Sequence, residues 1–111
     1  MLNYSDPLDG VFKALGDGAR RKILEQLSRG EATLSAIAEP LEISLSAVHQ
    51  HVALLEAVGL VACEKRGRER FCRLDARGLD RADAWIRGRR RLWENRLAAL
   101  DGYLAREKRG R

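Results

Sequence analysis

The segment that decides the fold runs from Thr33 to Leu74. It reads TLSAIAEPLEISLSAVHQHVALLEAVGLV (33–61) and then ACEKRGRERFCRL (62–74). The first part has the spacing of two short helices joined by a tight turn, and the second reads as two strands around a basic turn. A helix-turn-helix followed directly by an arginine-rich hairpin, called the wing below, is a shape that reads DNA.

Polar residues that can cap helices stand where each apolar helical pattern begins. They are Asp6, Asp17, Thr33, Ser44 and Asp75. We therefore expect one domain over 1–111, with two helices at 6–28, the helix-turn-helix at 33–58, the wing at 60–74 and a long helix at 75–106. The expected fold class is mainly α with a small β-hairpin.

Charge is distributed unevenly along the chain. The 111 residues carry a formal net charge of +5. Residues 1–60 contain five Lys and Arg against eight Asp and Glu, a net of −3, whereas 61–111 contain sixteen against eight, a net of +8. The positive excess lies in the wing and the last helix and suits an anionic partner, although solvated surface explains most arginines of that helix.

Several classes of protein are disfavoured by what the sequence lacks. No apolar run is long enough to span a membrane, and no secretory signal is recognisable. Two cysteines without such a signal indicate a reducing cytoplasm. The absence of a Gly-rich phosphate loop and of a Ser/His/Asp or Cys/His pattern argues against an enzyme.

The length of the turn in the wing would set the pairing register of its two strands. A two-residue turn at Gly67-Arg68 pairs residues whose numbers sum to 135, which places Cys63 opposite Cys72. Lys65 and Arg70 then share the side of these cysteines. A three-residue turn would shift the pairing.

The last helix is too long for the globule that bears it. At 1.5 Å per residue it would measure roughly 45 Å, whereas a domain of this size has a radius of gyration of about 13 Å. Leu79, Ile86, Trp93 and Leu100 recur every seven residues within its broad apolar stripe. The stripe can pack on the first two helices alone, but its length favours a second subunit.

The chain resembles the ArsR/SmtB family of bacterial repressors from about Leu8 to Tyr103. The motifs that carry the resemblance are VFKALGDGARRKILEQL (11–27), ISLSAVHQHVALLEAVGLV (43–61) and KRGRERFCRL (65–74). The resemblance implies a winged helix-turn-helix homodimer that binds an imperfect palindrome in promoter DNA and blocks transcription. The ending of the chain is similar to a branch of the family without a known metal site.

The resemblance also implies which residues meet double-stranded DNA. The recognition helix would be 44–57, and the wing would follow a minor groove or phosphates. The implied DNA-binding residues are Ser44, Ser46, Ala47, His49, Gln50, Lys65, Arg66, Arg68 and Arg70. Gln can pair with adenine and Ser with a base or a phosphate. Ser44 can equally act as a helix cap, and His51 is expected to support the scaffold instead.

The first and last helices would form the dimer interface. Its expected residues are Leu8, Phe12, Leu79, Ile86, Leu92, Trp93, Leu97, Leu100 and Leu104. The family's two metal patterns are not met, because the third helix has no Cys or His and the last has no His. We therefore expect no metal and no cofactor.

Two readings remain open for Cys63 and Cys72. As a cross-strand pair with Cα atoms about 4.5 Å apart, they can form a redox-responsive disulfide at the short end of the usual geometry. Alternatively, both are small buried apolar residues.

One alternative function also remains. The chain could be a winged-helix protein-interaction module that has lost DNA binding. The exposed side of 44–57 discriminates between the two, because its Ser, His and Gln side chains beside a basic wing favour DNA.

Overall fold

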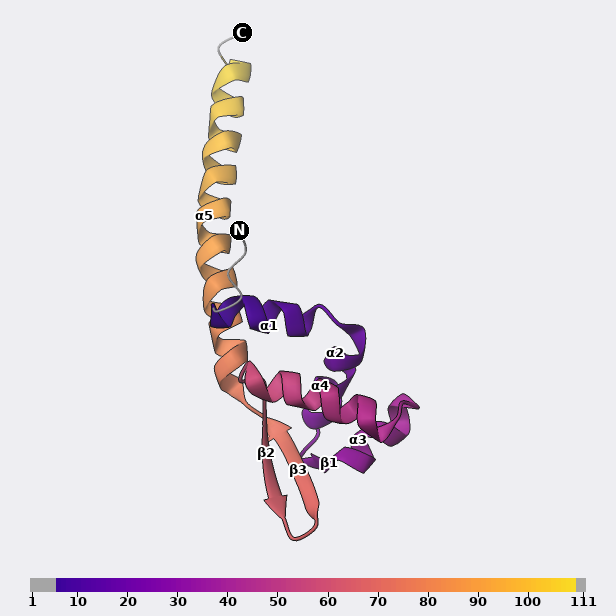
Figure 1. Ribbon diagram of the computed structural model, residues 1–111. Coiled ribbons are helices and arrows are strands. Elements are labelled where there is room, and N and C mark those ends of the chain that lie inside the picture. The colour runs from indigo at the N-terminus through magenta and orange to yellow at the C-terminus, as the bar shows by residue number, and fades with distance from the viewer. Residues whose placement is uncertain (1–5, 110–111) are drawn as a thin grey trace.

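The computed structural model describes residues 6–109, so the two ends of the predicted 1–111 domain lie outside the described residues (Figure 1). Within residues 6–109, five helices and three strands follow one another. They are α1 (Pro7–Leu15), α2 (Gly18–Leu27), β1 (Ala32–Thr33), α3 (Leu34–Leu41), α4 (Leu45–Ala57), β2 (Val61–Arg66), β3 (Glu69–Leu74) and α5 (Ala76–Arg109). The last helix therefore extends three residues beyond the predicted end.

Helix starts lie where the capping residues predict them. Asp6, Asp17 and Asp75 each accept a backbone N–H of the helix that follows. Within the helix-turn-helix, Thr33 Oγ1 accepts from Ala36 N at 3.2 Å and Ser44 Oγ accepts from Ala47 N at 3.0 Å. These bonds satisfy N–H groups that have no partner inside the helix.

A tight reversal separates α3 from α4. Glu42 follows α3 with a left-handed backbone, φ 54°. This conformation ends the helix in one residue and lets the chain turn before Ser44 starts α4. Residues 42–44, which lie between α3 and α4, are therefore the turn of a helix-turn-helix.

The core lies between the helix-turn-helix, α2 and the sheet. Six apolar residues of α2, α3 and α4 are at most 3% exposed. These are Ile23, Leu27, Ile37, Val48, Val52 and Leu55. Arg20 supports this packing from α2, because its Nε donates to His51 Nδ1 on α4 at 3.3 Å and its Nη1 to the Lys13 carbonyl at 3.3 Å. The expectation that His51 serves the scaffold agrees with this bond.

The sheet corrects one part of the prediction. The register with sums of 135 is confirmed for all six pairs of β2 and β3, including Cys63 with Cys72. However, β1 adds a third, antiparallel strand beside β3, so the order is β1-β3-β2 and the sheet is more than a hairpin. A strand of two residues is too short to show an alternating pattern, which is why the sequence did not reveal it.

The base of α5 is held against the end of α4. Gly59 has φ 77°, a left-handed value that suits glycine. Its carbonyl accepts from Gly78 N at 2.8 Å, and a Cβ on Gly78 would lie 2.9 Å from that same oxygen. The Leu60 carbonyl accepts from Asp75 N at 2.9 Å. Close backbone contact therefore fixes where α5 leaves the domain.

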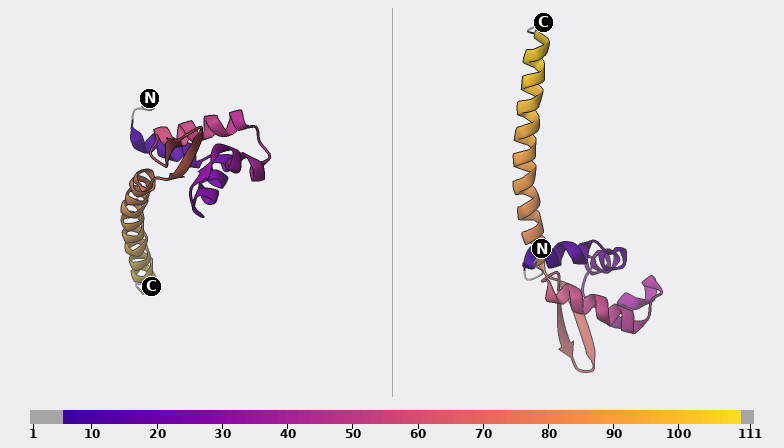
Figure 2. Two further views of the ribbon diagram at one scale, coloured as in Figure 1. Left: turned by 90° about the horizontal axis from the view of Figure 1, so that it is seen from below. Right: turned by 45° about the horizontal axis from the view of Figure 1, so that its top comes forward.

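Most of α5 projects away from the rest of the molecule (Figures 1 and 2). Phe12 of α1 meets Trp85 edge-on with ring centroids 5.6 Å apart. Beyond this contact, almost all residues of α5 are exposed within the part of the chain that the structure describes. The radius of gyration is 20.2 Å, against about 13 Å for a compact domain of this length. Among the described helices, none has the length and hydropathy that crossing a membrane requires.

Candidate nucleic-acid interface

One face of α4 is open to solvent. Ser46, His49 and Gln50 are exposed, and their spacing of three and four residues puts them side by side. Val48 and Val52 point to the opposite side and are buried. The helix therefore presents to solvent the polar side chains expected to read bases. Ala47 is half-buried and lies at the edge of this face.

Ser44 has a shown structural role, because its Oγ caps α4. The side chain is exposed, and the hydroxyl hydrogen is not used in that bond. A contact with a base or a phosphate is compatible with the cap and stays a prediction.

Leu45 is a surface residue that the sequence prediction did not select. It is 51% exposed in the first turn of α4. Its position just before Ser46 places an apolar side chain next to the polar face, where it can touch a thymine methyl. The only signal in the sequence was its absence from the buried stripe of Val48, Val52 and Leu55.

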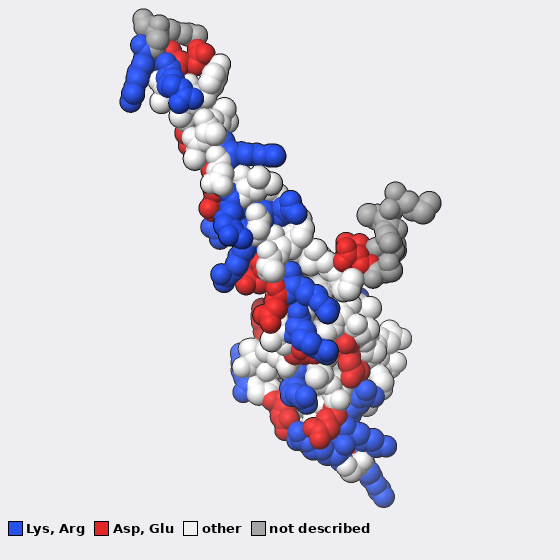
Figure 3. Space-filling model, turned by 90° about the vertical axis from the view of Figure 1, so that its left-hand side faces the viewer, with Lys and Arg blue, Asp and Glu red and all other residues white. Residues whose placement is uncertain are grey.

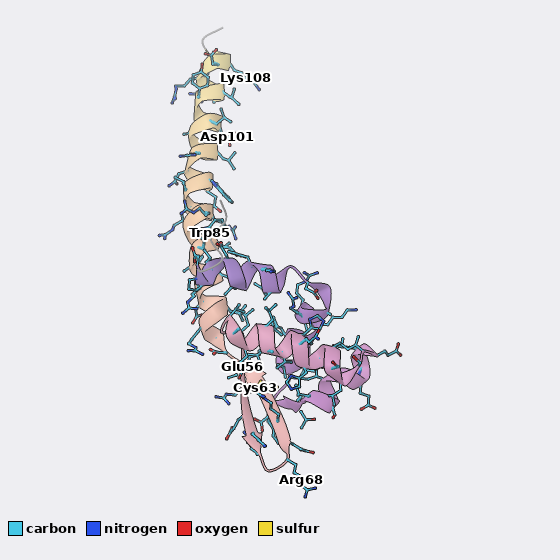
Figure 4. All side chains as sticks on the ribbon, viewed as in Figure 1. Glu56, Cys63, Arg68, Trp85, Asp101 and Lys108 are labelled. Atoms are coloured by element: carbon cyan, nitrogen blue, oxygen red, sulfur yellow. The ribbon has the colours of Figure 1, made fainter. Side chains whose placement is uncertain are left out.

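The wing carries free cations at its tip. Lys65 and Arg68 are exposed, and within residues 6–109 neither has an ion-pair partner. Arg68 points outward from the turn between β2 and β3 (Figure 4). Gly67 has φ 63°, and a positive φ at the first central residue alone is the pattern of a type II′ turn. The tip therefore holds Arg68 out toward solvent.

Arg66, in contrast, is bound by other residues of its own chain. Its guanidinium donates to both carboxylate oxygens of Glu31, at 2.6 and 3.0 Å, and to Glu64 at 3.0 Å. It lies over the Phe71 ring, 4.7 Å from the centroid. The hydrogen bond from Arg66 lowers the pKa of the Glu31 carboxyl. The side chain crosses β3 to reach Glu31, so this contact depends on β1, the strand that the sequence did not reveal.

Arg70 joins the wing to α4. Its Nη2 lies 3.3 Å from a carboxylate oxygen of Glu56, near the end of the recognition helix. Arg73 lies 4.0 Å from Glu64. Exposed ion pairs of this kind are weak and can be exchanged for phosphate contacts. Figure 3 shows carboxylates among the positive side chains of this surface.

A small hollow lies between α3, α4 and β3. It measures about 30 Å³ and has room for one water molecule rather than a ligand. Its lining residues are Leu34, His49, Val52, Ala53, Glu56 and Arg70.

The expected dimer residues lie on α1 and along one side of α5. Leu8 is half-buried, and Phe12 is 36% exposed. The seven expected positions on α5 are all exposed, from Leu79 to Leu104. Trp85 and Tyr103, which were not among the expected interface residues, belong to the same stripe. The single chain leaves this apolar surface uncovered.

The two cysteines are unbonded thiols in contact. Cys63 Sγ and Cys72 Sγ lie 3.1 Å apart. Burial, and then the hydrogen bond with Cys63, raise the pKa of the Cys72 thiol to about 12. Within residues 6–109, no three His, Cys, Asp or Glu side chains are grouped so that they could hold a metal ion.

Comparisons with known proteins agree with this geometry. A helix-turn-helix domain family matches residues 15–64. The HTH-type transcriptional regulator Rv2034 of Mycobacterium tuberculosis is 38% identical over 79 residues, which are 71% of this chain and 73% of that protein. The transcriptional repressor SdpR of Bacillus subtilis is 30% identical, over 71% of this chain and 88% of its own.

A solved structure shows the same arrangement. The ArsR-like transcriptional regulator from Rhodococcus sp. RHA1 superposes with a TM-score of 0.79 and 35% identity, and the match covers 86% of this chain and 87% of that one. Sequence and fold therefore agree over most of the molecule. The chain belongs to the ArsR family of winged helix-turn-helix transcriptional regulators.

Proposed function

We propose that this chain is a homodimeric repressor that binds an imperfect palindrome in a promoter. The observation that carries the proposal is that one chain has two separate surfaces that its own residues leave exposed. The polar face of α4 lies beside a wing with free cations at its tip, and α5 leaves a long apolar stripe exposed. The first surface suits DNA, and the second suits a second copy.

The dimer is supported by the extent of the uncovered stripe. Large apolar side chains on α5 that are at least 39% exposed include two tryptophans and five leucines. Monomeric proteins rarely expose contiguous apolar patches of this kind without a partner. A two-fold axis through α5 would join the stripes and project the two recognition helices to the same side.

Two-fold symmetry then links the protein to its operator. Recognition helices that read successive major grooves on one side of a duplex lie about 34 Å apart. Ser46, His49 and Gln50 would touch base edges, while Lys65 and Arg68 would bind phosphates and add affinity more than specificity. Repression would follow from occupation of the promoter, as the name of the relative SdpR suggests for that protein.

The test is binding to the DNA upstream of the protein's own gene. We would measure fluorescence anisotropy over a salt series, with a scrambled duplex of equal length and composition beside it. We expect preference for the upstream duplex and a steep fall in affinity as salt rises, because phosphate contacts release counterions. Equal binding to both duplexes would contradict an operator at this site and would favour the interaction module.

A pair of matched variants makes the test specific for the wing. Arg68→Ala should reduce the salt slope by about one, since it removes one phosphate contact. Arg87→Ala removes the same charge from α5, where Arg87 pairs with Asp83, and should leave the slope unchanged. Equal slopes for the two variants would refute the assigned role of the wing tip.

A further inference from the structure

Two thiols lie directly opposite each other where the wing joins the core. Cys63 on β2 pairs with Cys72 on β3, and their sulfur atoms are 3.1 Å apart. A disulfide needs a separation of about 2.05 Å. Both sulfurs already lie on the same side of the sheet, so an approach of about 1 Å, with no rearrangement of strands, would join them.

The two thiols differ in access. Cys72 is fully buried within the core, and its raised pKa keeps it protonated. Cys63 is half-buried at the neighbouring position. A small oxidant from solvent therefore reaches Cys63 first, and Cys72 is placed to react second.

We propose that a peroxide converts Cys63 and Cys72 into an intramolecular disulfide that weakens DNA binding. The chemical part concerns the free protein, whereas the effect on affinity rests on the proposed DNA-binding function. No third thiol is needed, because the chain contains two cysteines.

The reaction balances with hydrogen peroxide as the oxidant. The Cys63 thiolate attacks one peroxide oxygen, the O–O bond breaks, and Cys63 becomes a sulfenic acid while the other oxygen leaves as water. The Cys72 sulfur then attacks the Cys63 sulfur, and the S–O bond breaks. The Cys72 proton leaves with the departing hydroxyl as a second water. Two thiols lose two electrons in total, and one peroxide gains them.

The residue pair next to the cysteines connects the proposed disulfide to DNA binding. Lys65 and Arg70 form the next pair on the same side of the hairpin, one step closer to the tip. Arg70 is joined to Glu56 of α4, and Cys72 also pairs with Ala32 of β1. Figure 4 labels Glu56 on α4 and Cys63 on β2, where the wing joins the rest of the chain. The approach of the two sulfurs would keep the strand pairing and would shift the neighbouring pair, Lys65 and Arg70, relative to α4.

Mass spectrometry tests the chemistry without DNA. The protein would be treated with hydrogen peroxide, unfolded, exposed to iodoacetamide and weighed intact. We expect a monomer that has lost two hydrogens and takes up no label, whereas reduced protein takes up two labels. Labelling of both cysteines after oxidation, or disulfide-linked dimers, would overturn the proposal.

Anisotropy then tests the consequence with the same samples. We expect oxidation to lower operator affinity by about tenfold or more, the effect of losing one or two phosphate contacts, and dithiothreitol to restore it. Cys63→Ser, at the half-buried position, should bind like reduced protein with or without peroxide. Cys72→Ala provides a second variant, which leaves no unpaired hydroxyl in the core.

The outcomes are distinguishable. A disulfide that forms without changing affinity would overturn the regulatory part. Peroxide sensitivity that persists in both cysteine variants would do the same. If reduced protein binds no upstream DNA, both the proposed function and the regulatory part of this proposal are wrong. The mass measurement still decides whether the disulfide forms.

Discussion

The proposed dimer seam can be tested at Trp93. This side chain is 52% exposed on α5 and touches Trp85 edge-on, with ring centroids 6.5 Å apart. Substitution by aspartate removes the exposed apolar surface and places a charge where the partner's stripe would lie. Because Trp93 lies outside the buried core and its ring contact is with Trp85 of the same helix, the single subunit should remain folded.

The magnitude follows from the exposed area. A tryptophan side chain can bury about 250 Å², so the exposed half amounts to about 130 Å². At about 25 cal/mol per Å², its burial contributes about 3 kcal/mol, and the two-fold axis doubles this to about 6 kcal/mol per dimer. The dimer dissociation constant of Trp93→Asp should rise by about 10⁴-fold, and desolvation of two carboxylates adds to the effect.

Sedimentation equilibrium over a wide concentration range would measure this constant. Asn95→Asp is the matched control, since it adds the same charge at an exposed position two residues later, on the opposite side of the helix. Circular dichroism would verify that both variants keep their helices. If Trp93→Asp and Asn95→Asp dimerise alike, Trp93 is not in the seam and the reasoning from exposed area is wrong.

Four further variants test other features. Gln50→Ala should relax preference at one base position by about 1–3 kcal/mol, measured by anisotropy on single-base operator variants. Glu31→Gln should release Arg66 for a phosphate and steepen the salt slope by up to about one. Gly78→Ala should destabilise the fold by about 1–3 kcal/mol in urea denaturation, because its Cβ would lie 2.9 Å from the carbonyl oxygen that Gly78 N binds. Asp75 has a pKa lowered to about 2 by hydrogen bonds from Arg77, so its stabilisation is present above about pH 4 and lost towards pH 2. Above about pH 4, Asp75→Asn should melt at a lower temperature than wild type. The difference between the two melting temperatures should narrow as the pH falls towards 2.

Controls for two of these variants come from α5. Gly88→Ala is the counterpart of Gly78→Ala, because nothing lies within 4 Å of its added Cβ. It should stabilise the helix by about 0.5–1 kcal/mol rather than weaken it. Glu107→Gln removes a carboxylate far from the wing and should leave the salt slope unchanged. A loss of stability in both glycine variants would show that the loss at Gly78 does not come from the close contact with Gly59, because Gly88 has no such neighbour.

Local patterns predicted most of the fold. The caps at Thr33 and Ser44 depend on side chains within three residues of the N–H that they bind, and the hairpin register depends on a two-residue turn. Both are visible in a short stretch of sequence. β1 was missed because its two residues become a strand only through pairing with Cys72 and Phe71, which lie about forty residues later.

The candidate site shows the same division. That Ser46, His49 and Gln50 share an exposed face follows from helical spacing, and the structure agrees. The pairing of Arg66 with Glu31 could not be predicted, since it joins residues brought together by β1. The sequence thus showed how many cations the wing has, but not which of them are paired with carboxylates of the same chain. Their roles on DNA remain predictions that the variants above can decide.

The backbone contacts between Gly59 and Gly78 tie the base of α5 to the end of α4. Rotation of α5 by about 5° about its base would carry the far end of α4, about 20 Å away, through roughly 2 Å. In the proposed symmetric dimer, the crossing angle of the two long helices would therefore set the distance between the two recognition helices. In the proposed dimer, a substitution far out on α5 that changes this angle would therefore change which operator spacing fits, although no residue of the proposed DNA-binding face is altered.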